Sequence, residues 1–320
     1  MREFFQEEKG FIEVPTQSRL SILAACEDPK TISQFVFDGV NYPLPQTGQM
    51  WLEYELLKNP ERKGVFCVST SYRNEPNPIE GRHQKIFPMF EFESHGTMDD
   101  LVQMENDLLE HLGFGGRDYF TYDELCGEYG VEHLESKHEE EMCNKYGNVV
   151  FITKFPQRSH PFWNMKQNDK NKNLYNKVDV ILHGQETIGS AERSCNPEEM
   201  KDNFYNISNG EYAKLLFSKF TEGRVIKELN DYLSLDFIPR FGAGIGITRM
   251  ARAMELEGLL RSKCIVTYVT KKSHVKSNQT HCGYVWIVMT FTQFQKRSNK
   301  MYDSPALWVF GLEKKIFKNC

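Results

Sequence analysis

The chain has 320 residues, of which 40% are apolar and 26% charged, and its formal net charge is −5. This length allows one large domain or two modest ones, and the composition is ordinary for a globular protein. No apolar run reaches the ~18 residues that a membrane-spanning helix needs. The acidic N-terminal stretch MREFFQEEKGF is unlike a signal or transit peptide, so we expect a cytoplasmic protein.

Charge is distributed unevenly along the chain. Residues 263–320 contain ten Lys and Arg against two Asp and Glu, whereas residues 1–262 contain 29 against 42. We therefore predict an acidic main domain over 1–262 and a basic, poorly ordered C-terminal extension over 263–320. An acidic main domain argues against nucleic-acid binding through bulk charge alone.

The eight cysteines are scattered, and no two of them form a CxxC pair. A disulfide framework is typical of small secreted domains, and a zinc site usually shows closely spaced pairs. We expect reduced thiols, several of them buried.

In the first part of the chain, residues 2–10 have a helical pattern that ends at Gly10. A helix is predicted over 50–58, and GVFCVSTSY at 64–72 alternates as a strand does. A loop with the turn sequence NPIEG separates this strand from a second one at 87–93. The two strands therefore predict an antiparallel hairpin with a long loop.

In the second part, helical spacing at 98–114 is followed by a polar, charged stretch. Strand-like segments occur at 149–156 and 177–190, the latter with a turn at His183-Gly184. Residues 197–235 are mostly helical in pattern, and a Gly-rich strand at 239–260 continues into a helix. Because strands cluster without regular βαβ alternation, we predict an α+β domain with a mostly antiparallel sheet.

The first candidate cluster follows the strand at 64–72. Arg73 and Glu75 are two residues apart at the end of that strand, so their side chains would leave the same face. A guanidinium beside a carboxylate suits a ligand that has both an anionic group and an amino group. Arg82 and His83 across the loop add two potential phosphate donors. A surface salt bridge is the plainer alternative.

The second cluster is GAGIGITR at 242–249. Gly242, Gly244 and Gly246 alternate, which strips one strand face of side chains and lets a flat ligand lie against the backbone. Arg249 follows in the first turn of a helix, where the helix dipole favours anions. The stretch is neither a dinucleotide fingerprint nor a Walker A loop. Close packing alone is the other interpretation of these glycines.

The third cluster surrounds the turn at His183-Gly184. Asp179 and Glu186 would face each other across this hairpin, and paired carboxylates opposite phosphate-binding arginines suit Mg²⁺. Arg193, seven residues beyond Glu186, would bind a small anion such as an amino-acid carboxylate. Ordinary surface ion pairs are the alternative.

These three clusters, in this order, resemble the catalytic domain of class II aminoacyl-tRNA synthetases of the aspartate, asparagine and lysine subclass. Residues 2–17 are similar to motif 1, the dimer-interface helix and strand. Residues 71–93 are similar to motif 2 and residues 242–254 to motif 3, and KVDVILHGQETIGSAER at 177–193 also matches. The resemblance covers roughly residues 1–260 and implies a mostly antiparallel sheet flanked by helices.

The resemblance implies a role for each candidate residue, with ATP and Mg²⁺ as the cofactors. Arg73 would hold the α-phosphate of ATP, and Arg249 would reach the γ-phosphate, which makes these two the candidate catalytic residues. The other ATP ligands would be Glu75 on the adenine amino group, Phe87 stacked on adenine, His83 on the terminal phosphates, and Gly244 and Gly246 beneath the nucleotide. Asp179 and Glu186 would hold Mg²⁺.

Substrate choice rests on PLPQTGQMWLEYELL. In aspartate enzymes of this subclass, a lysine three residues after the position of Gln49 helps to read the substrate carboxylate. Leu52 stands there in this chain and is followed by Glu53, whose carboxylate suits the NH₂ donor of a carboxamide. The pattern is similar to asparaginyl-tRNA synthetases and to archaeal asparagine synthetase relatives. Gln49, Glu53 and Arg193 are thus the candidate amino-acid-binding residues.

The chain also departs from the family pattern. Gln17 stands where motif 1 usually ends in proline, Ile86 where a glutamate usually follows Arg-His, and Gly189 where a serine often helps the metal. The chain opens almost at motif 1, so we expect no N-terminal anticodon-binding barrel in it, and the basic tail is foreign to the pattern.

Three functions are compatible with these observations. The preferred one is an ATP-dependent ligase that adenylates asparagine or aspartate and charges tRNA, as a homodimer through residues 2–17. The second is an ammonia-dependent asparagine synthetase that acts on aspartate without tRNA. The third is a non-catalytic paralogue that binds or regulates partners.

Overall fold

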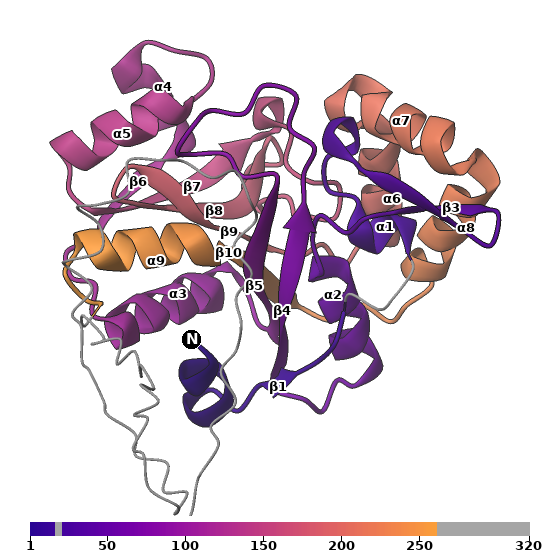
Figure 1. Ribbon diagram of the computed structural model, residues 1–320, viewed down its shortest axis with the longest axis horizontal. Coiled ribbons are helices and arrows are strands. Elements are labelled where there is room, and N and C mark those ends of the chain that lie inside the picture. The colour runs from indigo at the N-terminus through magenta and orange to yellow at the C-terminus, as the bar shows by residue number, and fades with distance from the viewer. Residues whose placement is uncertain (17–20, 261–320) are drawn as a thin grey trace, which may run out of the picture. The chain divides into compact units, whose positions relative to one another are not determined.

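The computed structural model describes residues 1–16 and 21–260 (Figure 1). Met1–Leu260 forms one compact unit. The predicted basic extension at 263–320 and the departure at Gln17 lie outside the described residues. Within the described part of the chain, no helix is long and apolar enough to cross a membrane.

A sheet of eight strands forms the centre of the described domain, in the order β1-β4-β5-β10-β9-β8-β7-β6. The β1–β4 and β6–β7 pairs are parallel and the other pairs are antiparallel, so the prediction of an α+β fold with a mostly antiparallel sheet is confirmed. The strands are β1 (Ile12–Glu13), β4 (Gly64–Tyr72), β5 (Ile86–His95), β6 (Asp118–Thr121), β7 (Val149–Pro156), β8 (Leu174–Leu182), β9 (Gln185–Glu192) and β10 (Arg240–Gly246).

Helices surround this sheet, and a two-stranded hairpin of β2 (Gln34–Phe37) and β3 (Val40–Pro43) lies apart from it (Figure 1). The α-helices are α1 (Ile22–Ala25), α2 (Gln49–Lys58), α3 (Met98–Leu112), α4 (Tyr122–Tyr129), α5 (Ser136–Lys145), α6 (Pro197–Asn206), α7 (Glu211–Phe220), α8 (Glu222–Leu233) and α9 (Ile247–Leu256). Shorter helical turns are η1 (Phe4–Glu8, a π-helix), η2 (Pro29–Thr31), η3 (Gln157–Ser159) and η4 (Ile207–Gly210).

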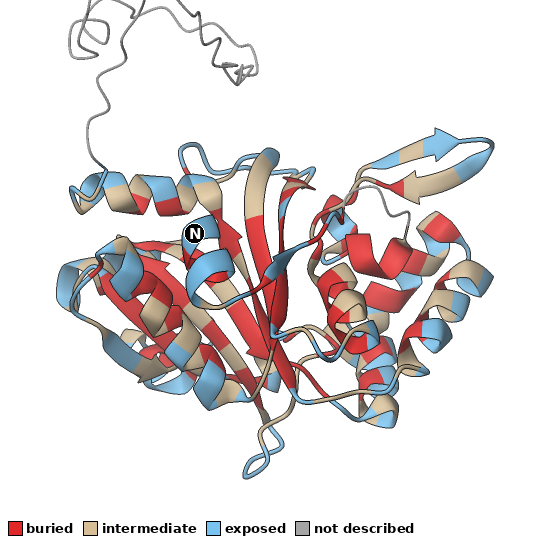
Figure 2. Ribbon diagram, turned by 90° about the horizontal axis from the view of Figure 1, so that it is seen from below, coloured by how far each residue is buried: buried red, intermediate tan, exposed pale blue. Residues whose placement is uncertain are grey.

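Four apolar clusters lie within the described residues, and two of them are much larger than the others. The larger one lies between the sheet and the helices α3 and α9, and it includes Phe4 and Phe5 of the N-terminal helical turn. The second one lies inside the group of α1, α6, α7 and α8, around the fully buried Trp163. Each such buried aromatic ring contributes about 1.5–3 kcal/mol by leaving water. Figure 2 shows the sheet strands largely buried between these layers.

Both predicted hairpins, β4–β5 and β8–β9, are present in the structure, so these predictions are confirmed. β4 and β5 pair in antiparallel register from Gly64↔Ser94 to Tyr72↔Ile86. β8 and β9 pair around His183 and Gly184, whose φ values of 47° and 75° are those of a tight hairpin turn.

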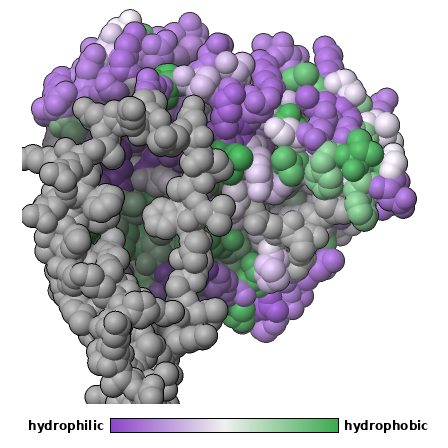
Figure 3. Space-filling model, in the orientation of Figure 1, coloured by the Kyte–Doolittle hydropathy of each residue, from purple (hydrophilic) through white to green (hydrophobic). Residues whose placement is uncertain are grey.

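Several elements in the described domain, α1 and β6 among them, had no counterpart among the predictions. Helices α4 and α5 occupy the polar stretch after α3, and the β2–β3 hairpin turns at Asp38 and Gly39, both with positive φ. The side chains of Val36, Phe37 and Val40 on that hairpin are exposed. Figure 3 shows the visible face as mainly polar, with apolar side chains gathered toward its right-hand edge, where this hairpin lies.

Candidate active site

A cavity of about 570 Å³ lies over the central strands β5, β10, β9 and β8, and the β4–β5 loop and the start of α9 also line it. Every candidate residue chosen from the sequence lines it: Gln49, Glu53, Arg73, Glu75, His83, Phe87, Asp179, Glu186, Arg193, Gly244, Gly246 and Arg249. Segments separated by as many as 200 residues therefore contribute to one site, as the resemblance implies.

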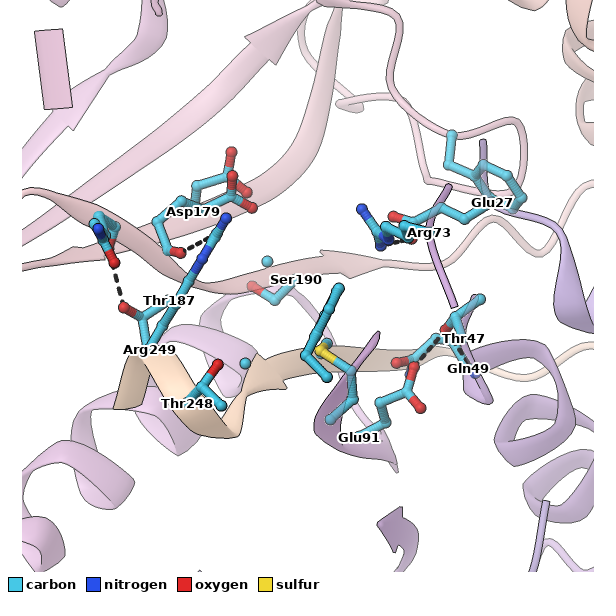
Figure 4. A pocket seen from close by; sticks show the side chains of 18 of the residues that line it. Glu27, Thr47, Gln49, Arg73, Glu91, Asp179, Thr187, Ser190, Thr248 and Arg249 are labelled. Atoms are coloured by element: carbon cyan, nitrogen blue, oxygen red, sulfur yellow. Dashed lines mark hydrogen bonds and ion pairs between the residues drawn. The ribbon is translucent and has the colours of Figure 1, made fainter. Parts of the chain in front are cut away.

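Arg73 and Arg249 enter the cavity from opposite sides (Figure 4). Arg73 forms an ion pair with Glu27, and its guanidinium carbon lies 5.9 Å from the centroid of the Phe87 ring. Arg249 extends from the first turn of α9 and donates from Nη1 to the backbone oxygen of Glu186 at 2.5 Å. Two guanidinium groups thus face a common space that would hold an elongated anion.

The prediction that Arg73 and Glu75 leave one face of a strand is wrong. β4 ends at Tyr72, and the residues that follow form a loop. We call residues 73–85 the phosphate loop. The backbone amide of Arg73 donates to Lys85 O at 2.8 Å, which closes the base of this loop.

Arg82 lines the cavity as well, and its role as a phosphate donor stays a prediction. Its guanidinium is buried, forms an ion pair with Glu139 and donates to Gly184 O at 3.3 Å. The neighbouring His83 remains on the cavity wall, where its Nδ1 accepts from the amide of Ile79 at 3.2 Å. Ile86 is 63% exposed at the start of β5 and adds no polar group.

The carboxylates of the β8–β9 hairpin are not direct partners, which corrects their expected pairing. Asp179 lies opposite Gly189, and an irregularity after Val180 places Glu186 opposite Ile181. The two carboxylates nevertheless converge. A Cβ added to Gly189 would lie 3.2 Å from Glu186 Oε1 and 3.6 Å from Asp179 Oδ1, so glycine leaves room for both.

The donor set at this point fits a hard divalent cation. Asp179 Oδ1 is buried without a hydrogen-bond partner, and Glu186 Oε1 is nearby across Gly189. Burial raises the pKa of Asp179 to about 7, an effect that Lys177 opposes and Glu186 reinforces. No group of three or more His, Cys, Asp or Glu forms a metal site within residues 1–16 and 21–260. A cation held here would take its remaining ligands from phosphate and water.

A buried network of paired charges backs the opposite end of the cavity, which Gln49, Glu53 and Arg193 line and from which Glu93 and Arg240 are set back. Glu53 accepts from Arg240 Nη2 at 2.7 Å, and Glu93 accepts from Arg193 Nε at 2.8 Å and from Gln49 Nε2 at 2.6 Å. All four charged side chains are buried. Burial raises the pKa of Glu93 to about 7, with Arg193 opposing this shift and Glu53 adding to it.

Both carboxylate oxygens of Glu53 already have protein partners. Asn164 Nδ2 donates to Oε1 at 2.7 Å, and the hydroxyl of Tyr232 donates to Oε2 at 2.7 Å. Glu53 thus lies in the cavity wall as the partner of Arg240 and presents no unpaired oxygen. Leu52 packs away from the cavity, against Val14, Leu56, Val65 and Cys67.

The glycines of β10 do not act alike. Gly244 and Gly246 line the cavity, whereas a Cβ on Gly242 would lie 2.1 Å from Glu93 Oε1 and 2.4 Å from Gln49 Nε2. Protein side chains therefore fill the space above Gly242, and the idea that all three glycines clear one face for a flat ligand is wrong. Only the C-terminal half of the strand is open.

The chain matches the family model of tRNA synthetases class II (D, K and N) over residues 1–261. The chain belongs to this family. The segments that resemble the three motifs form η1–β1, β4–β5 with the phosphate loop, and β10–α9.

Sequence similarity to a curated protein agrees with this family assignment. The aspartate–tRNA(Asp/Asn) ligase of Methanopyrus kandleri is 24% identical over 223 residues, which are 60% of this chain and 50% of that protein. The chain therefore spans about half the length of this curated relative.

Solved structures support the same fold. Asparaginyl-tRNA synthetase from Pyrococcus horikoshii, complexed with asparaginyl-adenylate, has a TM-score of 0.62 at 18% identity, covering 80% of this chain and 63% of that one. The asparaginyl-tRNA synthetase of Entamoeba histolytica has a TM-score of 0.59 at 19% identity, covering 80% and 61%. The aspartyl-tRNA synthetase of the same organism has a TM-score of 0.55 at 19% identity, covering 79% and 52%.

Several residues of this synthetase site were missed from the sequence. Glu91 on β5 accepts from Ser69 Oγ at 2.6 Å and from Gly48 N at 2.9 Å, and it also pairs with the hydroxyl of Thr47. Glu93 and Arg240 complete the charge network described above. One signal was available for the two glutamates: they alternate with phenylalanines in FEFE, and charges inside an apolar strand are usually there for a partner.

Proposed function

We propose that this chain is the catalytic part of a tRNA ligase that activates asparagine with ATP. The observation that carries this proposal is the charge balance at the amino-acid end of the cavity. There the two guanidinium groups of Arg193 and Arg240 are each paired with a buried carboxylate, Glu93 and Glu53. A neutral side-chain carboxamide can enter without leaving any of these charges unpaired.

Aspartate would be a poorer substrate for the same reason. Its second carboxylate would need a cation, and both arginines in this part of the described structure already have anionic partners. Burying an uncompensated charge is costly, whereas a carboxamide needs only hydrogen-bond donors and acceptors. Arg193 is placed to donate to the amide oxygen, because it lines the cavity with its guanidinium anchored on Glu93.

The nucleotide would occupy the other end of the cavity. Arg73 would bind the α-phosphate and Arg249 the far end of the triphosphate, since the two guanidiniums approach from opposite sides (Figure 4). Glu75 would receive the adenine amino group and Phe87 would stack on the ring, with His83 on the terminal phosphates. Gly244 and Gly246 would leave room for the nucleotide beneath it.

The chemistry would be an in-line attack of the amino-acid carboxylate on the α-phosphorus, with pyrophosphate as the leaving group. Such a reaction depends on positioning and on charge neutralisation more than on an acid or a base. Mg²⁺, held by Asp179 and Glu186, would neutralise phosphate charge when bound. Arg73 would stabilise the charge that develops on the α-phosphate, which is the role of a catalytic residue.

Transfer to tRNA and pairing into a homodimer are part of this proposal. β1 lies at one edge of the sheet, and its Ile12 is exposed, which suits contact with a second copy. Replacing Ile12 with lysine would then convert a dimer into a monomer, as measured by light scattering. An unchanged dimer in the I12K variant would exclude β1 from the interface.

The non-hydrolysable analogues asparaginyl- and aspartyl-sulfamoyladenosine test the substrate directly. Calorimetry should show the asparaginyl analogue binding at least tenfold more tightly than the aspartyl one. Equal or reversed affinities would overturn the choice of asparagine. Binding of neither analogue would overturn the proposed function.

A further inference from the structure

The carboxylate of Glu139, on helix α5, joins two separate walls of the candidate ATP site. It forms an ion pair with Arg82 of the phosphate loop, and its Oε2 accepts from the backbone amide of Glu186 at 2.7 Å. Glu139 does not itself line the cavity, so any effect it has on a ligand acts through these two partners.

Arg82 is buried and Glu139 is partly buried. The side chain of Arg82 is 6% exposed and that of Glu139 is 16% exposed. Arg82 also donates from Nη1 to Gly184 O at 3.3 Å, so its guanidinium bridges the helix and the β8–β9 turn. Separating the two groups of such an ion pair would leave an uncompensated charge away from water, which is costly. The pair therefore holds its groups in one arrangement.

Helix α5 rests directly on the β8–β9 turn. A Cβ on Gly184 would lie 3.1 Å from Glu140 Cα and 3.5 Å from Glu139 O, and Gly184 has a φ of +75°. Glycine is required here both for its conformation and for the close approach of the helix. This backbone contact fixes the position of Glu139 relative to the hairpin.

Each wall carries candidate ligands of ATP. His83 follows Arg82 in the phosphate loop, and Glu186 contributes its carboxylate to the proposed cation site. The backbone oxygen of Glu186 also accepts from Arg249 Nη1 at 2.5 Å. The contacts of Glu139 therefore connect the loop, the hairpin and the N-terminal turn of α9.

We propose that Glu139 is a positioning residue of the ATP site, whose carboxylate locks the phosphate loop onto the β8–β9 turn. The inference rests on the proposed function, because it assumes that ATP is the ligand between these walls. Without Glu139, the loop carrying His83 and the turn carrying Glu186 separate, and ATP binds more weakly while the amino-acid end is unaffected.

The direction in which ATP affinity changes when Glu139 is removed distinguishes a positioning role from a simple charge effect. Removing Glu139 also frees the positive charge of Arg82 near the cavity, and a free guanidinium would strengthen the binding of an anionic nucleotide. A positioning role predicts weaker ATP binding in spite of this added charge.

The test compares E139A and E139Q with E140A. Glu140 is the neighbouring carboxylate, 69% exposed and 4.0 Å from Arg82, which makes it a matched control. In amino-acid-dependent ATP–pyrophosphate exchange, we expect E139A to raise the KM for ATP at least tenfold and to leave the KM for asparagine within twofold. E139Q should be intermediate, because its amide oxygen can still accept from Glu186 N. E140A should remain within twofold for both substrates.

Hydrogen exchange gives a readout that does not depend on activity. Amides of residues 76–84 and 183–187 should exchange faster in E139A and E139Q than in the unaltered chain and in E140A. An unchanged or lower KM for ATP in E139A or E139Q, or unchanged protection of both segments, would overturn the positioning role. If the unaltered chain activates no amino acid, the proposed function fails, and the exchange rates still decide whether Glu139 locks the loop.

Discussion

Arg240 and Glu53 form a fully buried ion pair in which Nη2 and Nε lie 2.7 and 3.0 Å from the same carboxylate oxygen, Oε2. The hydroxyl of Tyr232 donates to this oxygen as well. The pair joins helix α2 to strand β10. Both the structure of the amino-acid end of the cavity and the packing of α2 on the sheet therefore depend on this one contact.

Replacing Arg240 with methionine should lower the free energy of unfolding by about 3–5 kcal/mol, because it leaves the charge of Glu53 buried and unpaired. Urea denaturation measures this change. The control is K227A, which breaks a surface pair whose side chains are 76% and 57% exposed and should cost less than about 1 kcal/mol. A R240M variant as stable as K227A would show that the buried pair has no structural role.

Replacing Gly242 with alanine should raise the KM for the amino acid and lower stability by about 1–3 kcal/mol. The added Cβ would lie 2.1 Å from Glu93 Oε1 and 2.4 Å from Gln49 Nε2, so both side chains must move. Gly223 in α8 has no atom within 4 Å of the same position, and G223A should be neutral or stabilising by up to about 1 kcal/mol. Equal KM values for G242A and the unaltered chain would contradict the described position of Gln49.

Glu105 makes stability depend on pH. It is fully buried on α3, neither carboxylate oxygen has a hydrogen-bond partner, and burial raises its pKa from 4.5 to about 8. Because the folded state binds this proton more tightly than the unfolded state, the stability that the neutral form contributes is fully present below pH 4.5. It is lost as the pH rises toward about 8, by up to roughly 1.4 kcal/mol per pH unit.

The E105Q variant should therefore gain stability relative to the unaltered chain as the pH rises from 5 to 8, as measured by urea denaturation. E110Q is the control, since Glu110 lies on the exposed face of the same helix. A stability difference between E105Q and the unaltered chain that does not change with pH would show that Glu105 is ionised in the folded protein.

The preference for asparagine over aspartate should weaken at low pH. Burial raises the pKa of Glu93 to about 7, so below this pH the carboxyl is mostly neutral and the charge of Arg193 becomes available to a substrate carboxylate. The ratio of kcat/KM for aspartate to that for asparagine should rise as the pH falls from 8 to 6. The E93Q variant should show a raised ratio at every pH. If the ratio in E93Q still rises steeply as the pH falls from 8 to 6, a group other than Glu93 is the cause.

The sequence allowed prediction of the parts of the fold that local patterns determine. The alternation of β4 and β5, the turn at His183 and Gly184, and the Gly-rich strand before Arg249 each have a local signal, and each was found in the structure. The local signals for α4 were also present, since Thr121 and Glu124 form a capping box and Gly130 ends the helix with positive φ, but the polar composition of this stretch obscured them.

The partners of charged residues could not be predicted in the same way. Arg82 pairs with Glu139, 57 residues away, and Glu53 pairs with Arg240, 187 residues away. Such pairs form only when the tertiary structure brings their elements together, and no local periodicity reports them. The irregularity that shifts Glu186 relative to Asp179 likewise depends on a single bulge in β8–β9 pairing.

ATP–pyrophosphate exchange in the presence of asparagine tests the central claim most directly. The unaltered chain should catalyse exchange with asparagine faster than with aspartate, and R73A should lose at least about a hundredfold in rate. R158A is the matched control, because the side chains of Arg158 and Arg73 are 37% and 34% exposed and each pairs with one carboxylate. Exchange with no amino acid, or equal exchange by R73A and the unaltered chain, would contradict the account.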